Sequence, residues 1–196
     1  MKSPRNVAVS ALALVALMLA GCAAQNSESA TTIEQVLDQA RAANDEAAVA
    51  ALSDLTVTRA EVDAASDRMI ACLEQNGLRV VDNGVNPLDG WRHELDIYWD
   101  GMSDSDGQRI SDECQSKDYS FVSQGYYLMN EDQVDPAILP DILACVQGKG
   151  VEIPDDARSL RALLPLGSED PNLTVVTTCA QTAAAAHGFT ALSIVL

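Results

Sequence analysis

Basic residues are scarce in this chain. Its 196 residues include 12 lysines and arginines against 29 aspartates and glutamates, which gives a formal net charge of -17. A general nucleic-acid binder needs a basic surface to replace counterions, so we expect no nucleic-acid partner. Long apolar runs are scarce too: the single one near the N-terminus excludes a protein that crosses the membrane several times. The chain is nevertheless 47% hydrophobic, which is too apolar for a disordered acidic tail.

The common motifs of catalysis and metal binding are also missing. The chain has two histidines, His93 and His187, and neither has the spacing of a zinc site. It has no Gly-x-Ser-x-Gly nucleophile turn and no glycine-rich phosphate loop. Residues 102–113 match a calcium loop in part, but Met102 stands where the first oxygen ligand is needed. The sequence therefore points to no catalytic residue, metal ligand or cofactor, and it favours a non-catalytic role.

Residues 1–21 have the pattern of an export signal. Lys2 and Arg5 precede an uncharged apolar stretch at 7–19, which is short for a membrane span but typical of a signal peptide. The stretch ends in Leu19-Ala20-Gly21-Cys22, and small residues before a cysteine let the chain enter a peptidase cleft in extended form. The alternative is an ordinary secretory signal in which the cysteine stands by chance.

The run Leu19-Ala20-Gly21-Cys22 resembles the lipobox of bacterial lipoproteins. This resemblance implies cleavage before Cys22 and diacylation of its thiol. Two acyl chains anchor a protein lastingly, whereas one gives only marginal binding. Since an anionic leaflet repels so acidic a domain, the lipid is the expected membrane contact. We expect a protein on the extracytoplasmic face of the cell membrane.

Four cysteines remain after Cys22, namely Cys72, Cys114, Cys145 and Cys179. An even number in an exported chain indicates disulfides, with three possible pairings. Residues 69–80 resemble residues 142–153: both contain Ala-Cys, an apolar residue after it, and a glycine five positions beyond the cysteine. Each copy is followed by one further cysteine. The repeat favours Cys72–Cys114 and Cys145–Cys179, and the alternative is chance similarity in an alanine-rich chain.

The composition divides the chain into five parts. They are a signal peptide at 1–21, a tether at 22–32, an N-terminal helical segment at 33–57, a first repeat at 58–130 and a second repeat at 131–196. Apolar spacing predicts one helix over 33–52. The fold class we expect is α+β and helix-rich, with two related disulfide-stapled subdomains around short strands.

Local signals predict the elements of the first repeat. Thr58 and Glu61 form a capping box that opens a helix, and Gly77 is expected to end it. Strands follow at 78–81 and 95–99, with a turn signal at 82–84. Helices are then expected at 103–117 and 119–129, the first opened by a serine cap and an acidic turn.

The second repeat is expected to begin with Asp135 as a helix cap and Pro136 at the first helical position. That helix is predicted to run to residue 149. A strand at 151–153 and helices at 155–164 and 172–186 follow. Residues 189–196 are apolar and β-branched at the end, and we expect them to close a small sheet.

Aromatic residues are few but gathered. Of eight, seven lie between positions 91 and 127: Trp91, Tyr98, Trp99, Tyr119, Phe121, Tyr126 and Tyr127. Tyrosine and tryptophan are enriched at binding surfaces, which makes Trp91, Trp99, Tyr126 and Tyr127 the candidate ligand-binding residues. A small domain needs large side chains inside, so the favoured reading is a core around the small sheet. A mixed outcome would bury Trp99, Phe121 and Tyr126 and leave Trp91 and Tyr127 at a rim.

The assembled pattern resembles small envelope lipoproteins of actinobacteria that carry a Cys–four residues–Gly motif, often twice. The resemblance covers roughly residues 59–179 and implies a lipid-anchored, disulfide-stapled domain outside the cytoplasmic membrane, without an activity. The leading hypothesis is a binding or interaction module for an envelope protein, a wall component or a small solute. The alternatives are an envelope enzyme acting on cell-wall material and a divalent-cation binder.

Overall fold

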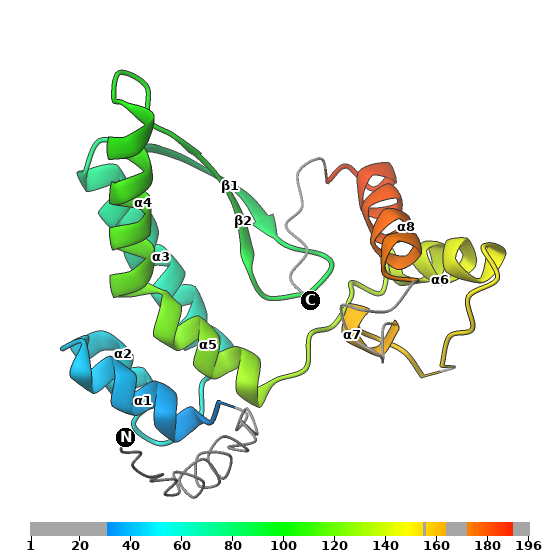
Figure 1. Ribbon diagram of the computed structural model, residues 1–196, viewed down its shortest axis with the longest axis horizontal. Coiled ribbons are helices and arrows are strands. Elements are labelled where there is room, and N and C mark those ends of the chain that lie inside the picture. The colour runs from blue at the N-terminus through cyan, green and yellow to red at the C-terminus, as the bar shows by residue number, and fades with distance from the viewer. Residues whose placement is uncertain (1–30, 155, 164–171, 190–196) are drawn as a thin grey trace, which may run out of the picture. The chain divides into compact units, whose positions relative to one another are not determined.

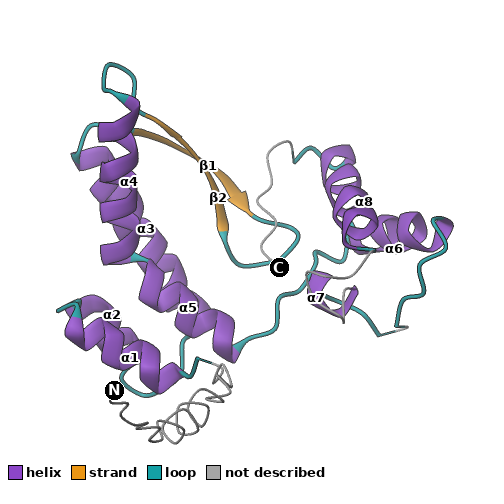
Figure 2. Cartoon of the chain, viewed as in Figure 1, coloured by secondary structure: helices purple, strands orange, loops and turns teal. Residues whose placement is uncertain are grey.

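The computed structural model describes residues 31–154, 156–163 and 172–189, all within the compact unit Thr31–Leu196 (Figure 1). These residues form helices and one β-hairpin, so the α+β, helix-rich class is confirmed (Figure 2). The predicted signal peptide, the lipidation site Cys22, nearly all of the tether and the final strand at 190–196 lie outside the described residues.

The N-terminal segment contains two helices where one was predicted. Helix α1 (Ile33–Ala42) and helix α2 (Glu46–Leu52) are separated by Asn44, which has a left-handed φ of 56°. Asp45 then caps α2, because its Oδ1 accepts from the backbone N–H of Ala48 at 2.9 Å. The prediction of a single helix over 33–52 is therefore wrong: Asn tolerates the left-handed conformation and Asp begins a new helix.

Helices α1 and α2 pack on helix α5 (Ser120–Met129). The close approach depends on Gly125, because a Cβ built at that position would lie 2.5 Å from Cδ2 of Leu52. Buried side chains from α1, α2 and the start of helix α3 (Arg59–Gln75) join Val122 of α5 in one core cluster.

The predicted capping box opens α3. The hydroxyl of Thr58 accepts from the N–H of Glu61, and the Glu61 carboxylate accepts from the N–H of Thr58 at 2.7 Å. The helix packs along helix α4 (Asp104–Asp118), which Ser103 caps as predicted. The disulfide Cys72–Cys114 joins the two helices with a Cα–Cα distance of 5.7 Å, so this predicted pairing is confirmed.

Strands β1 (Arg79–Val85) and β2 (His93–Tyr98) form an antiparallel hairpin. Both predicted strands are present, but the turn predicted at 82–84 is wrong, because β1 continues through those residues to Val85 and β2 begins at His93. Val80, Leu95 and Ile97 pack toward the cluster formed by α3 and α4, because alternate strand residues face one side. The register is irregular between Asp82 and Val85.

The second repeat contains helix α6 (Leu139–Gly148), the short helix α7 (Leu160–Leu163) and helix α8 (Leu173–Ala186). The disulfide Cys145–Cys179 joins α6 and α8, which confirms the second predicted pairing. Asn172 precedes α8, in agreement with the predicted start.

Two predictions for the second repeat are wrong: the start of its first helix and the strand expected after that helix. The helix begins at Leu139, not at Pro136, because Pro140 lacks an N–H and fits only within the first turn. Asp135 instead closes a turn by accepting from the N–H of Ala137 at 2.7 Å. Residues 151–153 do not pair as a strand with any described residue, and of the helix predicted at 155–164 the structure shows α7.

The two cysteine copies end their first helices with the same geometry. In the first, Leu78 N donates to Leu73 O at 3.1 Å, and in the second Val151 N donates to Val146 O at 3.3 Å. Gly77 and Gly150 occupy the left-handed position between, with φ of 85° and 80°. Both are Schellman caps, in which glycine carries no Cβ penalty. The sequence similarity therefore corresponds to one local structure formed twice.

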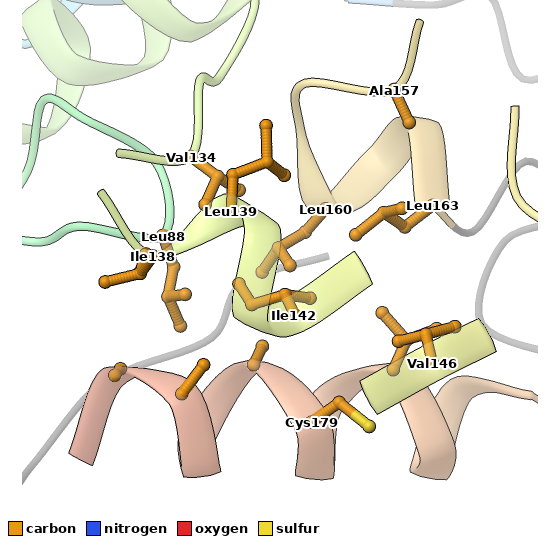
Figure 3. Close-up of a cluster of buried hydrophobic side chains, with 14 residues drawn as sticks. Leu88, Val134, Ile138, Leu139, Ile142, Val146, Ala157, Leu160, Leu163 and Cys179 are labelled. Carbon is orange, nitrogen blue, oxygen red and sulfur yellow. The ribbon is translucent and has the colours of Figure 1, made fainter. Parts of the chain in front are cut away.

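The core of the second repeat includes one side chain from the hairpin loop of the first repeat. Leu88, in the loop between β1 and β2, is 2% exposed and belongs to the buried cluster of α6, α7 and α8. Figure 3 shows its side chain beside Ile138 and above the helix that carries Cys179. The first repeat thus contributes directly to the packing of the second.

Candidate binding site

The four candidate aromatics do not form one site. Trp91 was expected at a rim, but it is 6% exposed and belongs to the core cluster of α1, α2 and α5. Its ring lies 5.1 Å from the ring of Tyr126, and Tyr127 packs against the same cluster. Trp99 lies apart, in the cluster of α3 and α4. The rim position for Trp91 is therefore wrong, and Trp99, Phe121 and Tyr126, expected to be buried, are half-buried.

A pocket lies instead under the hairpin, between α3, β2 and α4. Its volume is about 210 Å³. Met69 of α3 and Leu95 and Ile97 of β2 form its apolar wall. These side chains face inward because α3 presents its apolar stripe to α4 and to the inner face of the hairpin.

Three ionisable residues line the pocket, and each has a partner within the chain. Arg92 donates through Nε to Oδ2 of the buried Asp89. His93 places Nδ1 2.8 Å from Oδ2 of Asp82. Glu94 accepts a hydrogen bond from the amide of Asn86. These pairs hold the three side chains in fixed positions at the pocket.

His93 also approaches a second carboxylate. Its Nε2 lies 3.6 Å from Oδ1 of Asp63 on α3, while Nδ1 contacts Asp82 on β1. Asp63 accepts in turn from Nε of Arg59 at 2.7 Å. The imidazole thus bridges hairpin and helix, and both ring nitrogens face carboxylates of the protein. This arrangement orients the ring and leaves neither nitrogen directed at a serine.

Four uncharged polar side chains complete the lining: Ser66, Ser111, Gln115 and Tyr119. Ser66 is the most deeply buried of the four, at 2% exposed.

Tyr119 connects α4 to α5 and lines the same pocket. Burial raises the pKa of this phenol to about 12, and the nearby Arg92 opposes the shift only in part. The hydroxyl therefore stays protonated over the physiological range, where it can donate and accept hydrogen bonds.

Sequence reasoning missed this pocket because its residues come from α3, β2, α4 and the residues beside them, which meet only in the folded chain. One local signal was present. On α3 the buried stripe runs through Val62, Ala65, Met69 and Leu73, and Ser66 stands within it. A serine on the apolar stripe of an amphipathic helix is a departure that marks a polar site in the core.

The partial calcium motif has a structural explanation. Trp99 Nε1 donates to Asp104 at 3.1 Å, and Ser103 donates to Asp106 at 2.7 Å, so both carboxylates are engaged at the start of α4. Within the part of the chain that the structure covers, no group of three His, Cys, Asp or Glu side chains could hold a metal ion.

Comparisons with protein families, with curated proteins and with solved structures find no match to this chain. None of the helices between residues 31 and 189 that the structure describes has both the length and the apolar character needed to span a membrane.

Proposed function

We propose that the chain is a lipid-anchored binding module on the extracytoplasmic face of the cell membrane, and that the pocket under the hairpin holds a small solute or a fragment of envelope material. The observation that carries the binding role is the pocket itself, a space of about 210 Å³ in which Ser66, Ser111 and Tyr119 lie among apolar side chains. Such a mixed lining can bind a ligand through hydrogen bonds and apolar contact together.

Three features support the location. The N-terminal pattern and the lipobox resemblance imply export and acylation at Cys22. The disulfides Cys72–Cys114 and Cys145–Cys179 suit an oxidising compartment, because the cytosol keeps thiols reduced. The strong negative charge favours solubility of the domain beside the membrane.

Binding is favoured over catalysis by the state of the polar groups. A serine nucleophile needs an adjacent base, and the histidine at this pocket is directed to Asp82 and Asp63. Tyr119, with its raised pKa, is not a base near neutral pH. The groups that remain are hydroxyls and an amide, which bind and orient a ligand.

The location is tested on the full chain expressed in a bacterial envelope. We expect mass spectrometry of the N-terminal peptide to show diacylglyceryl on Cys22, and the protein to partition with membranes. The Cys22→Ala variant should lose both. An unmodified Cys22 in the mature wild-type protein would contradict the anchoring proposal.

The binding role is tested by capture of small molecules from envelope extracts, read by mass spectrometry. Ser111→Leu fills the pocket from α4, and Ser116→Leu is the matched control because Ser116 is exposed on the same helix and does not line the pocket. A compound retained by wild type and Ser116→Leu but lost from a folded Ser111→Leu supports the proposal. Equal retention by all three proteins, or none by any, contradicts it.

A further inference from the structure

We propose that the ligand of this pocket is an uncharged, hydroxyl-rich molecule of the size of one sugar ring. The inference rests on the proposed binding function and specifies its ligand class. Three independent properties of the lining lead to it: the pairing of its charged groups, the character of its free polar groups and the form of its apolar wall.

The charged groups argue against an ionic ligand. Arg92 is engaged by Asp89, His93 by Asp82 and Glu94 by Asn86. An anion would have to draw Arg92 away from a buried carboxylate, which would leave Asp89 without its guanidinium. It would also approach a chain of net charge -17. A cation that reached Glu94 would lie against Arg92 in the same wall. A neutral ligand disturbs none of these pairs.

The free polar groups match hydroxyls. The side chains of Ser66, Ser111 and Tyr119 each offer an O–H donor and acceptor lone pairs, and Gln115 offers both functions on its amide. Neighbouring hydroxyls of a sugar or cyclitol are donors and acceptors in the same way. A ligand of this kind can exchange hydrogen bonds with these side chains in both directions.

The apolar wall and the volume restrict the ligand further. Met69, Leu95 and Ile97 supply a C–H surface among the polar groups, which suits a ring that has C–H faces and hydroxyls at its edge. The volume of about 210 Å³ lies below the roughly 300–1,000 Å³ of pockets that bury drug-sized molecules. The space fits one ring and excludes a buried oligosaccharide.

The test uses the full lipoprotein in lipid discs, because many detergents carry sugar headgroups. Glucose, galactose, arabinose, N-acetylglucosamine and myo-inositol are titrated and followed by saturation-transfer NMR and calorimetry. Glucose 6-phosphate, glucuronate and glucosamine are the charged counterparts. We expect at least one neutral compound to bind, with its charged counterpart at least about tenfold weaker. No binding by any neutral probe, or equal binding of a charged counterpart, overturns the ligand class.

Variants place the binding at the pocket. Ser66→Ala and Tyr119→Phe each remove one hydroxyl and keep the packing. Each should raise the Kd of the bound neutral compound about tenfold. Ser116→Ala is the control and should leave the Kd unchanged. Wild-type affinity in both pocket variants overturns the assignment.

If the envelope capture instead retains a charged compound that Ser111→Leu loses, the ligand class is wrong and the binding function stands. If neither experiment detects a ligand, both proposals fail.

Discussion

The indole Nε1 of Trp91 donates a hydrogen bond to Oδ1 of Asp132 at 2.7 Å, across a sequence separation of 41 residues. This bond joins the hairpin loop to the segment that leads into the second repeat. Backbone bonds reinforce it, because Gln133 N donates to Asp89 O at 3.0 Å and Asp135 N to Pro87 O at 2.7 Å. The hairpin loop is therefore hydrogen-bonded at several residues to the segment that connects the two repeats.

Asp132 is expected to reduce stability at neutral pH. Burial raises the pKa of its carboxyl, and the hydrogen bond from Trp91 opposes this only in part. The folded state then binds the proton more tightly than the unfolded state. The stabilisation from protonated Asp132 is therefore complete below the ordinary pKa of aspartate and is lost as pH rises through the folded pKa. Asp132→Asn keeps an acceptor for Trp91 without the charge. We expect a higher Tm than wild type near neutral pH and no difference near about pH 3. A lower Tm for the variant at neutral pH would contradict this account.

Leu88 is expected to stabilise the second repeat from the loop of the first. Because its side chain is buried among α6, α7 and α8, Leu88→Ala should cost about 2–5 kcal/mol in urea unfolding. Hydrogen exchange should then accelerate in α6 and α8 as well as in the hairpin loop. Leu128→Ala is the control, since Leu128 is exposed, and it should change stability by less than about 0.5 kcal/mol. Unchanged exchange in α8 of Leu88→Ala would show that the repeats are independent.

The two disulfides should contribute similar free energies. They close loops with sequence separations of 42 and 34, for which chain entropy gives about 4 kcal/mol each as an upper figure. We expect the paired replacements Cys72→Ala with Cys114→Ala, and Cys145→Ala with Cys179→Ala, to lower the urea midpoint by comparable amounts. Peptide mapping of the mature protein without reductant is the direct check. A Cys72–Cys145 peptide in that map would refute the repeat-based pairing.

Gly107 and Gly148 should respond to alanine in opposite directions. A Cβ at Gly107 would overlap the ring of Trp99, whereas one at Gly148 meets no atom within 4 Å. Gly107→Ala should destabilise by about 1–3 kcal/mol because Trp99 must move. Gly148→Ala lies at the end of α6 and should gain up to about 1 kcal/mol from helix propensity. Urea unfolding measures both, and a stabilised Gly107→Ala would disprove the contact.

Ser66→Ala should stabilise the free protein while it weakens ligand binding. The substitution places a better helix former on the buried stripe of α3, so a gain of about 0.5 kcal/mol is expected. Thermal unfolding without ligand checks the first effect, and Ser116→Ala serves as the exposed control. A loss of stability in Ser66→Ala would mean that the hydroxyl has a structural role.

Local signals predicted much of the fold because they act within a few residues. The Thr58 capping box, the Ser103 cap and the glycine after each cysteine helix are of this kind. The disulfide pairing followed from the order of the repeat. Where two local signals compete, prediction failed: the alanine-rich run hid the break at Asn44, and Pro136 was chosen over Pro140.

Long-range contacts account for the remaining errors. Trp91 is buried because α5 and Asp132 meet the hairpin loop, and no pattern near position 91 specifies that meeting. The pocket likewise depends on β2 folding over α3 and α4. The gathering of aromatic residues suggested a binding surface as one reading, whereas the pocket is lined by a mixture of apolar, ionisable and uncharged polar side chains.

The central claim is that the space under the hairpin binds a ligand, and amide NMR of the isotope-labelled full chain in lipid discs tests it most directly. Small molecules from the envelope are added, and chemical shifts are followed residue by residue. The account predicts changes at Ser66 on α3, Leu95 on β2 and Ser111 on α4, and their loss in Ser111→Leu. Changes confined to other residues, or an unaltered spectrum, would contradict it.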